Sequence, residues 1–159
     1  MVKNIKKRKS VNIIDESVLS KRNIIYLSII LIISFLAFSP ALDNEFVKWD
    51  DDWYIQENPQ MNNFSFSKIE NIFTTFYKGQ YSPVSTLILS LQYNLGSKSP
   101  FLLHLGSILI HLLNIFLVFY LARLLFRKNN IGLIAAILFG ISGMQIESVA
   151  WISAQKVLI

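Results

Sequence analysis

Cysteine is absent from this chain, and charged side chains are scarce. Zero cysteines among 159 residues exclude disulfide bonds and thiolate chemistry. The two histidines have neither the His-x-x-x-His nor the His-Glu-x-x-His spacing, which argues against a zinc site. Charged residues make up 16% of the chain, whereas a soluble domain carries about 25%. Together with a hydrophobic content of 53%, this deficit indicates a membrane protein.

Three apolar segments explain the hydrophobic content. They cover residues 24–42, 101–122 and 131–152, and the last is interrupted near 142–143. About 20 apolar residues are needed for a helix to cross a bilayer. We therefore expect an all-α membrane protein with about three transmembrane helices. A cleaved signal peptide is the less favoured explanation of the first segment, because 23 residues precede it and Pro40 lies where cleavage would fall.

The distribution of charge predicts an orientation. Residues 1–23 form a tail with seven lysines and arginines against two acids, and the connector 123–130 adds three more cations. The loop 43–100 carries seven acids and four lysines. Basic loops stay in the cytoplasm, so we expect a cytoplasmic amino terminus in the cell membrane, with 43–100 and the end 153–159 outside. Because the basic run adjoins a span, it does not indicate nucleic-acid binding.

The external loop contains patterns typical of two short amphipathic helices at the membrane surface. Ser67 followed by Glu70 predicts a capping box for the first helix, and Pro83 marks the start of the second. The apolar positions at helical spacing are Ile69, Ile72, Phe73 and Phe76, then Val84, Leu87, Ile88, Leu91 and Leu95. Ser99 and Pro100 predict the cap and first residue of the second span. We expect the two short helices to form a floor or lid close to three aspartates.

Those aspartates are Asp50, Asp51 and Asp52, flanked by two tryptophans and a tyrosine. Three adjacent carboxylates repel one another, so stability alone does not explain them. Aromatic side chains of this kind anchor at a membrane surface. The combination predicts a site that handles a cation, or a base that accepts a proton. A charge run that only solvates a loop is the alternative.

A polar stripe runs along the second span. Its residues lie on one helix face and are His104, Ser107, His111 and Asn114. Polar groups facing lipid are costly, so the stripe faces a bundle or a wet cavity. For His111 and Asn114 we favour hydrogen bonds to neighbouring helices. His104 lies nearest the external face, where contact with a phosphate or with the aspartates competes equally with packing.

Two further residues are candidate contacts for a substrate or cation. Glu147 lies within or beside the third span, where an acid is a functional hypothesis by default. Lys156 follows it and could bind an anionic headgroup or a sugar phosphate. A solvated helix end and a snorkelling lysine are the respective alternatives.

The order of these motifs resembles the amino-terminal part of GT-C-type membrane glycosyltransferases, closest to the transmembrane, tetratricopeptide-bearing O-mannosyltransferase group and its bacterial relatives. The resemblance covers about residues 24–159. The stretches that carry it are Phe46 to Asp52 with Asn58-Pro59, then Tyr81 to Val84 with Pro100 to Asn114, and Glu147 to Trp151 with Lys156. Family members commonly have His-Pro in place of Ser142-Gly143, and Arg-Lys-Asp in place of Gln155-Lys156-Val157.

The resemblance implies a partial GT-C fold and transfer of a sugar from a polyprenyl-phosphate carrier to an extracytoplasmic acceptor. It implies Asp51 as the catalytic base, with Asp50 or Asp52 orienting the acceptor or a cation. A carboxylate can take the acceptor's proton as its oxygen attacks. Whether a divalent ion binds is left open by the sequence.

Relatives have many more spans, so we expect an amino-terminal fragment that is inactive without the remainder of the transferase. An alternative is a small non-enzymatic membrane protein that binds a membrane partner through its polar helix face. An ion-binding or transport element ranks last, because such sites lie near the midplane of the bilayer.

Overall fold

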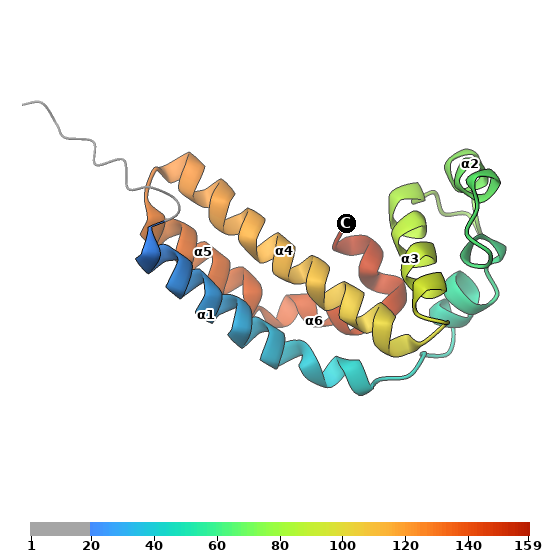
Figure 1. The fold of residues 1–159 in the computed structure, drawn as a ribbon, viewed down its shortest axis with the longest axis horizontal. Helices are drawn as coiled ribbons and strands as arrows, with labels where there is room; N and C mark the ends of the chain where they lie inside the picture. Colours follow the sequence, from blue (N-terminus) through green and yellow to red (C-terminus); the bar gives the residue numbers. More distant parts are fainter. Residues whose placement is uncertain (1–19) are drawn as a thin grey trace, which may run out of the picture.

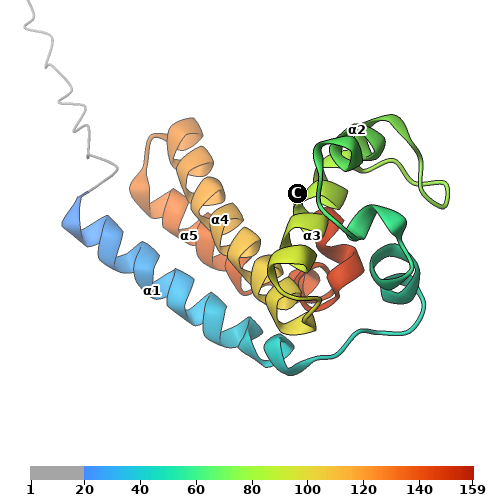
Figure 2. The same ribbon diagram turned by 45° about the vertical axis from the view of Figure 1, so that its right-hand side comes forward.

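The computed structural model describes residues 20–159, which form an all-α membrane protein. Three helices lie side by side as an elongated bundle (Figures 1 and 2). They are α1 (Lys21–Phe38), α4 (Pro100–Phe126) and α5 (Asn129–Gly140). An arm made of α2 (Phe66–Thr74) and α3 (Pro83–Leu95) stands at one end of the bundle (Figure 1). Residues 1–19 of the predicted tail 1–23 lie outside the described residues. The end of the predicted tail belongs to α1, which begins at Lys21.

Within residues 20–159, two segments are long and apolar enough to cross a membrane by themselves. They are Lys21–Asp43, which is α1 with the 3-10 turn η1 (Ser39–Asp43), and α4. A third crossing arises if α5 and the helical stretch Gly143–Ala150 act as one span, bent by 52°. The connector is shorter than the predicted 123–130. The reason is that α4 continues to Phe126 and ends on Arg127 in the left-handed conformation, whose amide donates to the Arg123 carbonyl oxygen.

Small residues let α5 approach its neighbours closely. A Cβ on Gly132 would lie 2.8 Å from the Phe119 carbonyl oxygen of α4, and one on Gly140 would lie 2.7 Å from Ser34 Oγ of α1. Around these contacts the bundle core consists of Leu27, Ile30, Ile115, Phe119 and Ala136. Close backbone approach at small residues is a common way for helices to associate in membranes.

After Gly140 the chain bends and returns toward the arm (Figure 2). Ser142 accepts a hydrogen bond from the Met144 amide and caps the turn η4 (Gly143–Gln145). The short helix α6 (Ile146–Ala150) and the 3-10 segment η5 (Ile152–Val157) follow. Four consecutive residues of η5 are buried, from Ile152 to Gln155, and η5 contacts both α3 and α4.

The arm differs from expectation in its first cap. Ser65, not Ser67, caps α2, because its Oγ accepts a hydrogen bond from the Lys68 amide and the helix begins at Phe66. The predicted capping box of Ser67 with Glu70 is therefore wrong. In α3, which begins at Pro83, several of the predicted apolar residues point outward and are exposed: Val84, Leu91 and Leu95. The arm packs instead around Ile55, Met61, Leu89, Tyr93, Leu103 and Ile152.

Candidate functional site

The backbone around the acidic motif is irregular. Trp49 has φ of 88°, a value that non-glycine residues rarely adopt, and its side chain is 75% exposed. Directly after it, η2 (Asp52–Gln56) is a π-helix, in which the Glu57 amide donates to the Asp52 carbonyl oxygen at 2.8 Å. Such turns occur frequently at functional sites.

Asp51 is completely buried and hydrogen-bonded at both carboxylate oxygens. Oδ2 accepts from the Val47 amide at 2.9 Å, and Oδ1 accepts from the Ser153 amide at 3.0 Å and from the Ser153 hydroxyl. A buried charge is costly unless such donors surround it. Asp51 therefore joins the loop 43–100 to η5, across a separation of 102 residues in the chain.

Asp50 and Asp52 are less enclosed than Asp51. Both are half-buried, and neither side chain forms a hydrogen bond with the residues that the structure describes. Between positions 20 and 159, no group of three or more histidines and acids is arranged to hold a metal ion. The three neighbouring carboxylates thus have different surroundings. Asp51 is buried and accepts three hydrogen bonds, whereas Asp50 and Asp52 are partly accessible to solvent.

His104 lies beside the acidic motif. Its imidazole is 1% exposed and is close to the Asp51 carboxylate and to the backbone of Asn44. Neither ring nitrogen has a partner at good hydrogen-bonding geometry among residues 20–159. A contact of His104 with a phosphate or a cation stays a prediction.

The remaining members of the polar stripe are used inside the protein. His111 Nε2 lies 3.1 Å from the Gly140 carbonyl oxygen, and Asn114 Nδ2 donates to the Leu158 carbonyl oxygen at 2.7 Å. Ser107 Oγ accepts from Gln155 Nε2 at 3.0 Å. The predicted structural role of His111 and Asn114 is confirmed. His104, Ser107 and His111 are buried, and Asn114 is half-buried.

The other two candidates lie in different places. Glu147 is exposed on α6 and does not line the pocket between the arm and η5. Lys156 is half-buried, and its Nζ donates to Gln80 Oε1 at 3.1 Å and lies 5.1 Å from the centre of the Tyr54 ring.

A small pocket, partly open to solvent, lies between the arm and η5. Four stretches of the chain supply its polar walls: the segment after the acidic motif, residues 75–80 after α2, the start of α3, and η5. The lining residues are Tyr54, Asn58, Gln60, Met61, Ile72, Thr75, Tyr77, Gln80, Ser82, Ser85, Thr86, Leu89, Ser153 and Lys156. Of the predicted site residues, only Lys156 lines it directly, while Asp51 adjoins it through Ser153.

Several pocket residues were not predicted from the sequence. Ser153 and Ser85 stand in stretches with no distinctive spacing, and only the fold brings them to Asp51 and to the pocket. Tyr54 was noted as an interfacial anchor, whereas its ring lies under the Lys156 ammonium group. The aromatic residues beside the aspartates were the available signal for Tyr54.

A human enzyme is similar to this chain. The protein O-mannosyl-transferase TMTC1 of Homo sapiens is 28% identical over 130 residues, which cover 75% of this chain and 14% of the human protein. The chain thus spans a small part of the length of that relative. No protein-family model matches the chain, and no solved structure matches it. The similarity hints at a glycosyltransferase.

Proposed function

We propose that this chain forms the acidic part of the active site of a GT-C membrane glycosyltransferase. The enzyme transfers a sugar from a polyprenyl-phosphate carrier to an acceptor on the extracytoplasmic side. One observation carries the proposal: the three stretches that resemble such enzymes meet in space. Asn58, Ser82 and Lys156 line one pocket, and Asp51 joins its walls through Ser153.

The chemistry needs a base and an anionic leaving group. The acceptor hydroxyl oxygen attacks the anomeric carbon, the bond from that carbon to the carrier phosphate breaks, and the phosphate leaves with the electron pair. The hydroxyl proton goes to a carboxylate, for which Asp51 is the candidate. Asp51 is buried between the loop 43–100 and η5, so the acceptor can reach it only if its hydrogen bonds change. The hydrogen bonds of a catalytic base often rearrange in this way when substrate binds. Asp50 and Asp52 would orient the acceptor or a divalent cation.

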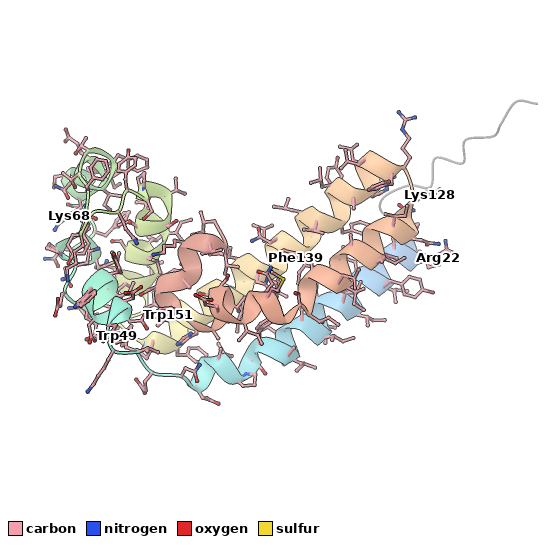
Figure 3. The ribbon with its side chains drawn as sticks, turned by 180° about the vertical axis from the view of Figure 1, so that it is seen from behind. Arg22, Trp49, Lys68, Lys128, Phe139 and Trp151 are labelled. Atoms are coloured by element: carbon pink, nitrogen blue, oxygen red, sulfur yellow. The ribbon has the colours of Figure 1, made fainter. Side chains whose placement is uncertain are left out.

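The charge distribution supports the orientation in the cell membrane. Figure 3 shows Arg22 and Lys128 at one end of the bundle, and Trp49 and Lys68 at the opposite end. The cations of the α4–α5 turn, Arg123, Arg127 and Lys128, gather at the first end. By the positive-inside rule this end is cytoplasmic, and the acidic loop then lies outside.

The test uses the longest reading frame that contains this chain, with Asp50→Asn, Asp51→Asn and Asp52→Asn made separately. Sugar transfer from a polyprenyl-phosphate donor is measured in membranes that hold equal amounts of each protein. A general base contributes about 10²–10⁴-fold, so Asp51→Asn should lower turnover by at least about 100-fold. Unchanged turnover in Asp51→Asn would remove its assignment as the base, and unchanged turnover in all three variants would remove the acidic motif from the active site.

A further inference from the structure

The proposed reaction leaves a proton on a buried group. Asp51 is completely buried, and its oxygens already accept from the Val47 amide, the Ser153 amide and the Ser153 hydroxyl. Once Asp51 has taken a proton from an acceptor, it must release that proton before it can act as a base again. Because solvent does not touch this carboxylate, a neighbouring side chain has to carry the proton away.

The second span and the acidic motif meet at His104. Leu103 of α4 is completely buried in one apolar cluster with Ile55, which follows the acidic motif in η2, and with Ile152, the first residue of η5. His104 comes next in α4, is 1% exposed and lies near the Asp51 carboxylate. Packing of the neighbouring residue therefore holds the imidazole beside the candidate base.

The imidazole also lies near residues that solvent reaches. Asn44 and Glu45, in the loop after η1, are close to the ring and are both exposed. Within residues 20–159, Asp51 and Glu45 are the charged side chains that face His104. The ring thus stands between a buried carboxylate and the molecular surface.

Neither ring nitrogen of His104 has a hydrogen-bond partner in the described part of the chain, although buried polar groups nearly always have one. The other histidine of α4 is different, since His111 Nε2 lies 3.1 Å from the Gly140 carbonyl oxygen. An imidazole can take up a proton at one nitrogen and release a proton from the other. It can do so only where neither nitrogen is already held by the fold, and His104 meets that condition.

We propose that His104 is the proton carrier that restores Asp51 after each sugar transfer. The proton leaves the Asp51 carboxyl group and binds one ring nitrogen of His104, which forms an imidazolium ion. The other ring nitrogen then releases a proton to water beside Glu45, which leaves a neutral imidazole and a charged carboxylate. No electrons are exchanged. The inference rests on the proposed function, because only a base that accepts protons needs such a carrier.

The test repeats the transfer assay on the longest reading frame that contains this chain, with His104→Gln and His104→Ala. Glutamine retains a donor and an acceptor but does not bind a proton at neutral pH. Positioned proton-transfer groups contribute about 10²–10⁴-fold where proton transfer limits the rate. We expect His104→Gln to lower kcat by at least about tenfold and to leave KM for the sugar donor unchanged, because the carrier acts after the sugar has been transferred.

Small added bases distinguish proton transfer from packing. Imidazole should restore part of the kcat of His104→Ala, because it fits the vacated space and carries protons. Pyrazole has the same size but does not bind a proton at neutral pH, so it should not restore kcat. His111→Gln is the matched control, since it removes the other histidine of α4, and imidazole should not change its turnover. Unimpaired turnover in His104→Gln, no restoration by imidazole, or equal restoration by pyrazole would overturn the proposal.

Nitrogen NMR of labelled imidazoles in the 159-residue chain tests the contact with His104 left in place. Asp51→Asn should shift the ring-nitrogen signals of His104 and leave those of His111, the other histidine of the chain, unchanged. If the His104 signals do not move, or both histidines move equally, His104 is not coupled to Asp51 and cannot be its carrier. Full turnover in Asp51→Asn would remove the proposed base. An inactive Asp51→Asn together with an unimpaired His104→Gln would remove only the proton carrier.

Discussion

At the residue scale, the Asp51 carboxylate connects two segments that lie far apart in the chain. The Val47 amide belongs to the loop after η1, and Ser153 belongs to η5. Because all three donors are directed at one buried side chain, its loss leaves them without an acceptor. An unsatisfied buried donor costs about 1–3 kcal/mol.

We predict that Asp51→Asn lowers the stability of the protein. An asparagine has one acceptor oxygen, and its amide group would face either the Val47 amide or Ser153. The expected loss is about 1–3 kcal/mol, measured as a lower apparent melting temperature of the detergent-purified chain by circular dichroism. Asp52→Asn is the control and should melt close to the unchanged protein, since Asp52 is half-buried with no side-chain hydrogen bond in the described region.

Ser153→Ala separates the hydroxyl from the backbone contribution. It removes one of the three donors and retains the Ser153 amide, so the expected loss is about 1 kcal/mol. In the double variant the two losses should not add, because both act on the same contact. If the stability losses of the two single variants add in the double variant, or if Asp52→Asn loses as much stability as Asp51→Asn, the hydrogen bonds between Asp51 and Ser153 do not stabilise the fold.

At the element scale, helix starts were largely predictable and faces were not. Ser99 and Pro100 begin α4 as expected, because a proline at the first helical position is a local signal. The cap of α2 is Ser65 and not the predicted Ser67, because the Ser65 hydroxyl accepts the hydrogen bond from the Lys68 amide. In α3, spacing identified an apolar face, but the side chains that are buried are Ser85, Leu89, Ser90 and Tyr93. Hydrogen bonds from Ser90 to the Gln60 carbonyl oxygen and from Asn94 to the Met61 carbonyl oxygen hold the helix in this orientation. That choice depends on contacts made 30 or more residues away.

The contact between α4 and α5 leads to a prediction about glycine. In Gly132→Ala the new methyl group would meet the Phe119 carbonyl oxygen at 2.8 Å, and a backbone atom cannot move aside without separating the helices. Overpacking of this kind costs about 1–3 kcal/mol. Gly143→Ala is the control, because nothing lies within 4 Å of its new methyl group. Equal melting temperatures for the two variants would show that α4 and α5 do not pack this closely.

At the scale of the whole molecule, the candidate site is a product of tertiary structure. The sequence identified the acidic motif and Lys156, because charges beside apolar segments are conspicuous. It could not predict that η5 folds back between α3 and α4, which brings Ser153 to Asp51 and Lys156 to Tyr54. This return depends on the 52° bend after Gly140, and the Ser142-Gly143 interruption indicated only where the helix breaks.

The orientation of the whole molecule can be tested by labelling single introduced cysteines, because the chain has no cysteine of its own that would react. Ser67 is exposed on α2 in the arm, and Asn130 is exposed at the start of α5 near the cationic turn. Replacing either with cysteine changes no charge, so the topology signal is preserved. With a membrane-impermeant maleimide on intact cells, we expect labelling of Ser67→Cys alone. Asn130→Cys should react only after the membrane is permeabilised. The reverse pattern would put the acidic motif in the cytoplasm, on the wrong side for an extracytoplasmic acceptor, while leaving the fold unaffected.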